Sequence, residues 1–152
     1  MQVLLVISIV VILAVLAWEV SNLRLKKNII YDTGQVCINK NCFEVELARD
    51  NFQIEKGLMF REKLEQDKGM LFVFNKEANY PFWMKNTKIP LDIIWINENE
   101  EIVYISEFTQ PCKTFFCPKI NPQKNAKYVL EINGGLSKKS NLKLGDKVEI
   151  LN

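Results

Sequence analysis

The first 20 residues restrict the folds open to this chain more than any other feature does. Their sequence, MQVLLVISIVVILAVLAWEV, holds no charged side chain before Glu19. A helix rises about 1.5 Å per residue, so about 20 apolar residues cross the hydrocarbon core of a bilayer. We therefore predict a transmembrane anchor over residues 1–20, with the lipid bilayer as its partner, a polar linker over 21–28 and a single folded domain over 29–152.

A cleaved signal peptide is the alternative interpretation of this segment. Val15-Leu16-Ala17 resembles a small-residue cleavage site, but the apolar run lacks the preceding Lys or Arg of a secretory leader. The anchor is therefore the favoured interpretation. The membrane orientation rests on conflicting signals, because Arg24, Lys26 and Lys27 follow the apolar run. Alone, the positive-inside rule places the domain in the cytoplasm.

Four cysteines argue for the opposite orientation. Cys37 and Cys42, and likewise Cys112 and Cys117, are separated by four residues. An even count in local pairs behind an export-like segment predicts two disulfides in an oxidising compartment, so we expect an extracytoplasmic domain. The Asn39-Lys40-Asn41 turn would set the first pair opposite each other, with Cα atoms ~5–6 Å apart. A four-thiolate zinc site and four buried free thiols are the alternatives.

Composition excludes several functional classes. The 20 basic and 18 acidic residues are scattered along the chain, so no nucleic-acid partner is expected. The absence of histidine excludes the usual catalytic triads and histidine-ligated zinc centres. Met59, Met70 and Met84 could ligate Cu(I), but each adjoins apolar or aromatic residues that indicate core packing. We predict no metal and no cofactor.

Short β-prone segments separated by turn residues predict the fold. Strands are expected over 31–38, 43–47, 69–74, 91–97, 101–108, 127–133 and 147–151. Asp50 and Gln53 form a capping-box pattern, which predicts a short helix over 51–56 that ends at Gly57. Gly134-Gly135 opens a second helical piece. The predicted fold is mainly β (α+β), a compact antiparallel sandwich or partly closed barrel with one or two short helices.

Several sequence blocks together resemble one prokaryotic family. GLMFREKL, DKGMLFVF, FWMKNTKIPLDIIWI, QPC with a second cysteine five residues on, YVLEINGG and GDKV occur in this order. The chain resembles the family called domain of unknown function one-nine-two over roughly residues 36–150. The resemblance implies a compact, mainly β domain, often behind a signal sequence or anchor, and no established activity. The family pattern falls on Gly57, Met59, Arg61, Gly69, Met70, Phe72, Trp83, Met84, Asn86, Thr87, Pro90, Asp92, Glu131 and Gly134.

The stretch PFWMKNTKIPLD is the best candidate for a site. An aromatic plane beside amide, hydroxyl and carboxylate groups is typical of shallow sites for sugars and similar hydroxylated molecules. Trp83 would supply the plane, while Arg61 or Lys85 could meet an anionic group. We therefore predict a site for a polar envelope ligand, such as a carbohydrate, made of Arg61, Trp83, Lys85, Asn86, Thr87, Asp92 and Glu131.

Two other classes of function compete with the binding site. A hydrolase could use Asp92 and Glu131, provided that both acids face one cleft. A purely structural or interaction module would instead use Asp92 as an acceptor for loop amides, and Glu131 as an exposed strand residue or a partner of Arg61. Turn residues next to strands usually have structural roles, so the structural interpretation of this stretch is the favoured one. Of the two functional classes, we favour binding over catalysis, and we predict no catalytic residue.

Overall fold

The computed structural model describes residues 11–16, 29–114 and 116–151. Two compact units divide the chain, Met1–Ile30 and Tyr31–Asn152, and residues 11–16 of the first are helical. Within the described ranges, no helix has the length and apolar character needed to span a membrane. Apart from 11–16, the anchor predicted over 1–20 and the linker over 21–28 lie outside the described residues.

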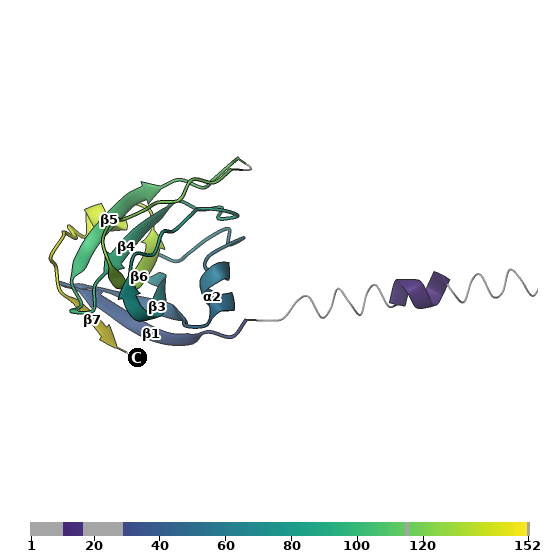
Figure 1. Ribbon diagram of the computed structural model, residues 1–152, viewed down its shortest axis with the longest axis horizontal. Coiled ribbons are helices and arrows are strands. Elements are labelled where there is room, and N and C mark those ends of the chain that lie inside the picture. Colours follow the sequence, from purple (N-terminus) through teal and green to yellow (C-terminus); the bar gives the residue numbers. More distant parts are fainter. Residues whose placement is uncertain (1–10, 17–28, 115, 152) are drawn as a thin grey trace, which may run out of the picture. The chain divides into compact units, whose positions relative to one another are not determined.

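One seven-stranded sheet, curled into a half-closed barrel, forms the second unit (Figure 1). Across the sheet the strand order is β5-β4-β6-β3-β2-β1-β7. The prediction of a mainly β fold with a few short helices is confirmed in its partly closed barrel form, and the sandwich form is excluded because the described strands make a single sheet. The strands are β1 (Asp32–Ile38), β2 (Asn41–Ala48), β3 (Lys68–Ala78), β4 (Leu91–Ile96), β5 (Ile102–Thr109), β6 (Ala126–Asn133) and β7 (Val148–Leu151).

Helix α2 (Asn51–Lys56) connects β2 and β3, which pair in parallel although the sequence predicted an antiparallel sheet. The Asp50 carboxylate accepts from the Gln53 backbone N–H at 2.7 Å, and the Gln53 side chain accepts from the Asp50 N–H at 3.2 Å. These two bonds confirm the capping box. Gly57 ends the helix with φ 45°. Because α2 and the segment after it carry the chain back before it re-enters the sheet, β3 runs in the direction of β2.

The edges of the sheet meet at the start of β5. The Ile102 N–H donates to the Asp146 carbonyl at 3.0 Å, and the Val148 N–H donates to the Glu100 carbonyl at 2.8 Å. Glu101 and Lys147 form an isolated bridge between these two bonds. No further pairing between β5 and β7 appears among the described strands, so the barrel closes only here.

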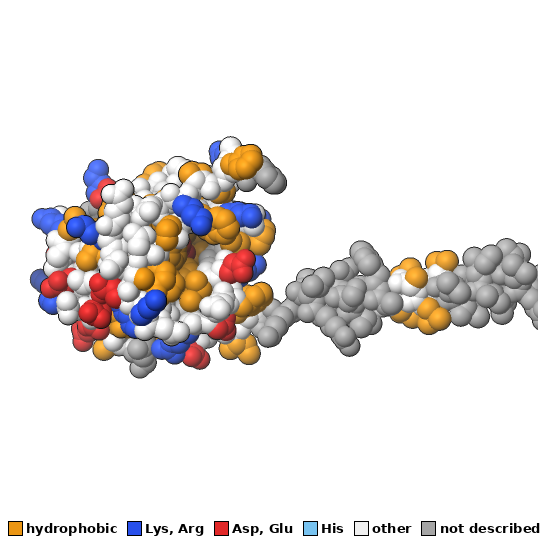
Figure 2. Space-filling view, in the orientation of Figure 1, with side chains coloured by type: hydrophobic (Ala, Val, Ile, Leu, Met, Phe, Trp, Pro, Cys, Tyr) orange, Lys and Arg blue, Asp and Glu red, His pale blue; other side chains and the backbone are white. Residues whose placement is uncertain are grey.

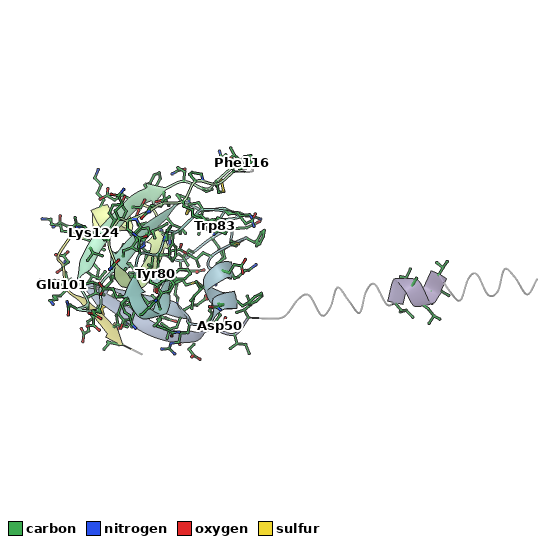
Figure 3. All side chains as sticks on the ribbon, in the orientation of Figure 1. Asp50, Tyr80, Trp83, Glu101, Phe116 and Lys124 are labelled. Atoms are coloured by element: carbon green, nitrogen blue, oxygen red, sulfur yellow. A yellow bond between two sulfur atoms is a disulfide. The ribbon has the colours of Figure 1, made fainter. Side chains whose placement is uncertain are left out.

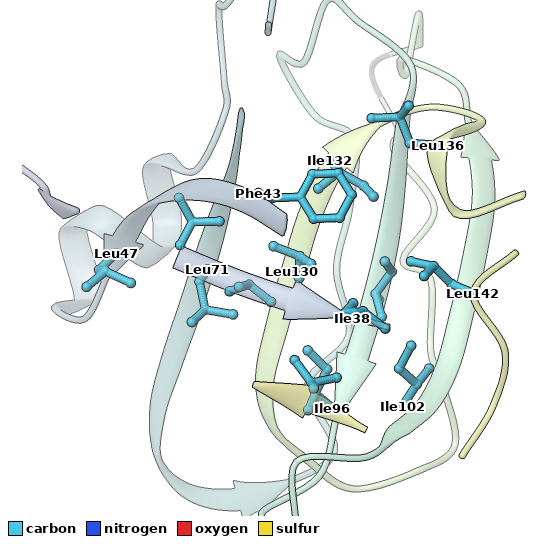
Figure 4. Close-up of a cluster of buried hydrophobic side chains, with 14 residues drawn as sticks. Ile38, Phe43, Leu47, Leu71, Ile96, Ile102, Leu130, Ile132, Leu136 and Leu142 are labelled. Carbon is cyan, nitrogen blue, oxygen red and sulfur yellow. The ribbon is translucent and has the colours of Figure 1, made fainter. Parts of the chain in front are cut away.

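Two apolar clusters cover the two faces of the sheet, because successive strand side chains point to opposite sides. Figure 4 shows the inner cluster, which includes Leu71, Leu130 and Ile132 and is closed by Leu136 of α3 (Leu136–Lys139). The outer cluster contains the alternate residues of the same strands, such as Phe72 and Val129. Residues of α2 and of the loops around 82–90 and 110–120 pack over this outer cluster, and they position the candidate site.

Both predicted disulfides are present. The Cα atoms are 4.0 Å apart in Cys37–Cys42 and 5.7 Å apart in Cys112–Cys117. Cys37 and Cys42 lie directly opposite each other in the β1–β2 ladder, and their turn is the two-residue Asn39-Lys40 rather than the longer loop we predicted. The first pair is closer than expected because the two cysteines are directly opposed in an antiparallel ladder, where Cα atoms approach more closely than the ~5–6 Å we predicted. The zinc and free-thiol alternatives are thereby excluded.

Candidate functional site

A cavity of about 280 Å³ opens on the outer face, between the end of α2 and residues 80–87. Glu131 of β6 lies among its lining residues, together with five aromatic side chains, Phe72, Phe74, Tyr80, Phe82 and Trp83. Figure 2 shows hydrophobic side chains gathered around a hollow on this face. The volume is near the lower end of the ~300–1,000 Å³ typical of ligand pockets, which suits a small molecule or one group of a larger one.

The aromatic walls are held in place by contacts with one another and with the sheet. The rings of Phe74 and Tyr80 stack with centroids 3.6 Å apart, and Phe82 meets Phe72 edge-on at 4.8 Å. The indole N–H of Trp95 donates to the Tyr80 carbonyl at 2.8 Å. Rings fixed in this way lose little conformational entropy when a ligand binds, which favours recognition.

Hydrogen bonds join the two chain segments on either side of the cavity. The Phe60 N–H donates to the Asn86 carbonyl at 2.8 Å, and the Asn86 side-chain amide contacts the Met59 sulfur at 3.8 Å. Asn86 has φ 57°, a left-handed conformation that asparagine tolerates better than most residues. Asn86 therefore positions the rim of the cavity.

The second disulfide supports the opposite wall. Phe82 and Ile120 exchange backbone hydrogen bonds of 3.0 and 2.7 Å, and the Cys112 N–H donates to the Met84 carbonyl at 3.3 Å. The Cys112–Cys117 bridge closes the loop between these two attachments. Figure 3 places Trp83 and Phe116 on loops on the same side of the domain, away from Glu101. A local crosslink thus stabilises the segment that carries Trp83.

Glu131 is a buried carboxyl without a partner. It is 5 % exposed, and among the described residues no hydrogen bond or ion pair reaches its side chain. Burial raises the pKa of Glu131 to about 8, although the positive charge of Arg61 opposes this shift. A Cβ at Gly57 would lie 3.2 Å from the Phe72 ring and 4.0 Å from Glu131 Oε2, so glycine lets the end of α2 close over the acid.

Arg61 pairs with Glu46 rather than with Glu131. Its Nη1 and Nη2 donate to the two Glu46 carboxylate oxygens at 2.7 and 2.5 Å. The hydrogen bond to Glu46 raises the pKa of Arg61, and the pair is only half-buried. In the sheet register, Glu46 lies opposite Met70, which lies opposite Glu131. The expectation that Glu131 is an exposed strand residue is therefore wrong. Among the described residues, Arg61 acts on Glu131 through its charge and not through a hydrogen bond or ion pair.

Asp92 has a structural role on the other face of the sheet. Its fully buried carboxylate accepts hydrogen bonds from the backbone N–H groups of Phe108 (2.6 Å), Gly135 (2.8 Å) and Ser137 (2.6 Å). On the neighbouring strand, Asp92 lies opposite Ile132 while Glu131 lies opposite Ile93. Adjacent register positions point to opposite faces. The two acids therefore do not face one cleft, as a paired-carboxylate hydrolase would require.

The structure brings together four of the seven side chains predicted for the site. Trp83, Lys85, Thr87 and Glu131 line the cavity, and the Lys85 ammonium lies 5.1 Å from the centre of the Trp83 ring. Thr87 is 8 % exposed, and its hydroxyl has no hydrogen-bond partner among the described residues. Asn86 supports the rim through its bonds to Phe60 and Met59, Arg61 lies outside the lining and bonds to Glu46, and Asp92 lies on the other face of the sheet.

Sequence reasoning missed most of the aromatic wall and part of the rim. The missed lining residues include Lys56, Gly57, Phe72, Phe74, Tyr80, Phe82 and Lys119. One signal was available, since Phe72 and Phe74 alternate along β3 and therefore share a face. Met70 and Met84 are buried in the outer apolar cluster, where they pack as core residues.

Fold and site together define a small half-barrel β domain with an aromatic-walled cavity over a buried acid. The chain belongs to the DUF192 family, described as uncharacterised ACR, whose model matches residues 34–150. The resemblance inferred from the sequence blocks is thereby confirmed. No curated protein matches the chain.

Two solved structures share this architecture. A "putative transcription regulator" from Sinorhizobium meliloti 1021 is 34% identical, with a TM-score of 0.75 over 81% of this chain and 97% of that one. A protein of unknown function from Novosphingobium aromaticivorans DSM 12444 is 35% identical, with a TM-score of 0.71 over 82% of this chain and 88% of that one. The half-barrel thus recurs in two bacterial relatives.

Proposed function

We infer that this protein is a membrane-anchored, extracytoplasmic binding domain that takes a small polar ligand in the cavity above Glu131. The observation that carries this conclusion is the 5 % exposed Glu131 side chain, which has no hydrogen-bond partner among the described residues and lies in a cavity lined largely by aromatic and other apolar side chains. A buried carboxyl without a partner destabilises a fold, so its presence at a cavity is better explained by a ligand than by packing.

The other lining groups fit a ligand with polar and apolar parts. The ring of Trp83 offers an apolar plane, while the Thr87 hydroxyl and the Glu131 carboxyl offer hydrogen bonds. Small-molecule sites usually contain a few polar groups among many apolar ones. A carbohydrate or another hydroxylated envelope component is therefore the first class of ligand to test.

Binding is favoured over hydrolysis because no second acid is hydrogen-bonded to Glu131 among the described residues, and Asp92 lies on the other face of the sheet. Glu55 lines the cavity too, but its side chain is exposed on α2. Hydrolysis by paired carboxylates needs two acids on either side of the scissile bond, about 5–10 Å apart. The positions of Asp92 and Glu131 on opposite faces of the sheet remove the pair that the sequence suggested.

Trp83→Ala is expected to weaken ligand binding at least tenfold, because it removes an aromatic plane worth about 1.4 kcal/mol of contact. The measurement is the thermal stabilisation of the purified full-length protein by a panel of envelope sugars and peptide fragments, followed by calorimetry on any hit. Trp83→Phe keeps a ring and should retain most of the affinity. Compounds that bind the natural protein and Trp83→Ala equally would place the binding site elsewhere. A panel in which no compound stabilises the protein would argue against the proposal.

The extracytoplasmic location is supported by the two disulfides, because such bridges persist in oxidising compartments. After free thiols are blocked in native membranes, peptide mapping without reductant should recover Cys37–Cys42 and Cys112–Cys117 as linked pairs. The intact mass of the same sample should retain residues 1–20 if they anchor the protein. Four blocked thiols would instead indicate a cytoplasmic domain, and a mass without the apolar segment would indicate a cleaved leader.

A further inference from the structure

Charges of opposite sign occupy the floor and the rim of the cavity. Glu131 is buried at the floor, whereas Lys56, Lys85 and Lys119 line the rim together with one exposed acid, Glu55. None of these three lysines forms an ion pair within the described part of the chain. A ligand with a positive inner end and a negative outer end would therefore meet complementary charge at both ends.

The floor of the cavity is suited to a cation. Both terminal nitrogens of Arg61, whose charge acts on Glu131, already bond to Glu46. The faces of aromatic rings attract cations, most strongly when water is excluded. This domain already shows the effect at its rim, where Lys56 lies 4.4 Å from the centre of the Phe60 ring and Lys85 lies over Trp83. An ammonium group would give Glu131 the counter-ion it lacks.

We propose that the ligand is a small zwitterion, whose ammonium group enters the aromatic-walled cavity to pair with Glu131 and whose anionic group stays at the lysine rim. This inference rests on the proposed function and narrows the ligand class. The Thr87 hydroxyl would accept a hydrogen bond if the ammonium carries hydrogen atoms, whereas a quaternary ammonium would meet the Glu131 charge and the aromatic rings without that hydrogen bond.

The proposal predicts how affinity depends on pH. In the empty site Glu131 keeps its proton up to about pH 8, so a cation must displace that proton to form the pair. As pH increases toward 8, the affinity for the cation should therefore rise ~10-fold per pH unit. The total increase between pH 6 and pH 9 should be ~100-fold. The chain contains no histidine. The other charged or titratable groups near the site are Tyr31, Glu46, Glu55, Lys56, Arg61, Tyr80, Lys85 and Lys119.

Calorimetry on the purified full-length protein at pH 6 and pH 9 tests the proposal with four probes. The zwitterion is 4-(trimethylammonio)butanoate, and 5,5-dimethylhexanoate is its matched control, because a carbon atom replaces the charged nitrogen. Choline carries the cation without the anion, and N-acetylglucosamine represents neutral sugars. We expect the zwitterion to bind more tightly than choline, to bind better at pH 9 than at pH 6, and to bind more tightly than its uncharged-head analogue at pH 9.

Matched variants assign the effect to the named residues. Glu131→Gln should abolish the pH dependence and weaken zwitterion binding at pH 9, whereas Glu149→Gln, an exposed site on β7, should change neither. The double variant Lys85→Gln, Lys119→Gln should weaken the zwitterion and leave choline unaffected. Equal binding of the zwitterion and its carbon analogue at pH 9 would overturn the inference. So would zwitterion affinity that decreases as pH rises from 6 to 9, or no zwitterion binding. Trp83-dependent binding of N-acetylglucosamine alone would overturn it while upholding the proposed function.

Discussion

Replacing Glu131 with glutamine is expected to raise the free energy of unfolding by about 3–5 kcal/mol at pH 8.5 and to change it little near pH 4.5. Burial raises the pKa of Glu131 from 4.5 to about 8 in the folded protein. Below pH 4.5 the carboxyl is protonated in the folded and unfolded states alike, so glutamine and glutamic acid are nearly equivalent. Above pH 8 the natural protein must bury a negative charge that glutamine lacks.

The direction of this pH dependence follows from the protons bound in each state. Between pH 4.5 and pH 8 the folded protein holds a proton on Glu131 that the unfolded chain releases. The contribution of protonated Glu131 to the free energy of unfolding is therefore fully present below pH 4.5. Between pH 4.5 and pH 8 it declines by about 1.4 kcal/mol per pH unit, and above pH 8 it is lost. Ion pairs lower the pKa of the exposed Glu62 and Glu101, and these groups act only at the acidic end of the range.

Urea denaturation of the natural protein and of the Glu131→Gln variant between pH 4.5 and pH 9 measures the difference directly. Other titrating groups cancel in this comparison, because both proteins contain them. Glu149→Gln serves as the control, since its side chain is exposed on β7 and should leave the profile unchanged. Parallel profiles for the natural protein and Glu131→Gln would mean that Glu131 is solvated or paired in solution.

Asp92→Ala should lower the free energy of unfolding by roughly 3–6 kcal/mol, a large part of the total for a domain of this size. The substitution removes the acceptor of three backbone N–H groups, those of Phe108, Gly135 and Ser137. A donor left buried without a partner costs about 1–3 kcal/mol. These three donors belong to the end of β5 and to the start of α3, so both elements should loosen.

Asp92→Asn separates the loss of one hydrogen bond from the loss of all three. Asp92 Oδ1 accepts from Phe108 and Gly135, whereas Oδ2 accepts from Ser137 alone. An asparagine oxygen at the first position retains two bonds, so the loss should be less than half that of alanine. Circular dichroism during denaturation reports both values. Equal destabilisation by the two variants would show that charge, rather than the number of acceptors, matters at this position.

The two acids differ in what their burial achieves. Asp92 has every oxygen bonded to backbone donors, so it strengthens the barrel. Glu131 is nearly as buried but has no described partner, so it weakens the fold above its pKa. Variants that stabilise a protein by removing a polar group commonly fall at functional positions, where a strained or unpaired group serves binding. Higher stability of Glu131→Gln would therefore support a ligand role for this acid.

Local chemistry allowed much of the fold to be predicted. The alternation of Phe43, Val45 and Leu47 identified a half-buried strand, and the Asp50 and Gln53 pattern identified the start of α2. Each signal acts within a few residues, and the structure preserves both. The parallel pairing of β2 with β3 escaped prediction because the connection over residues 49–67 holds only the six-residue helix α2, rather than the long helix usual in a parallel crossover.

The candidate site was predictable only in part, for a related reason. Trp83, Lys85 and Thr87 stand close in the sequence, and their mixture of aromatic, cationic and hydroxyl groups marked them as candidates. The partner of Arg61 depends on the register between β2, β3 and β6, which brings Glu46 rather than Glu131 to its guanidinium. No pattern within a single strand contains that information.

By itself the sequence determined the local elements of this protein: short strands, one capped helix and two disulfides between near neighbours, because period-two patterning, caps and turns act over short distances. The tertiary structure alone decided the roles of its two buried acids. Register placed Asp92 and Glu131 on opposite faces of the sheet. Segments distant in sequence, from α2 and from residues 80–87, then covered Glu131 and left its side chain 5 % exposed at the floor of the cavity. Burial and partner choice are long-range properties, which is why only the folded chain sets them.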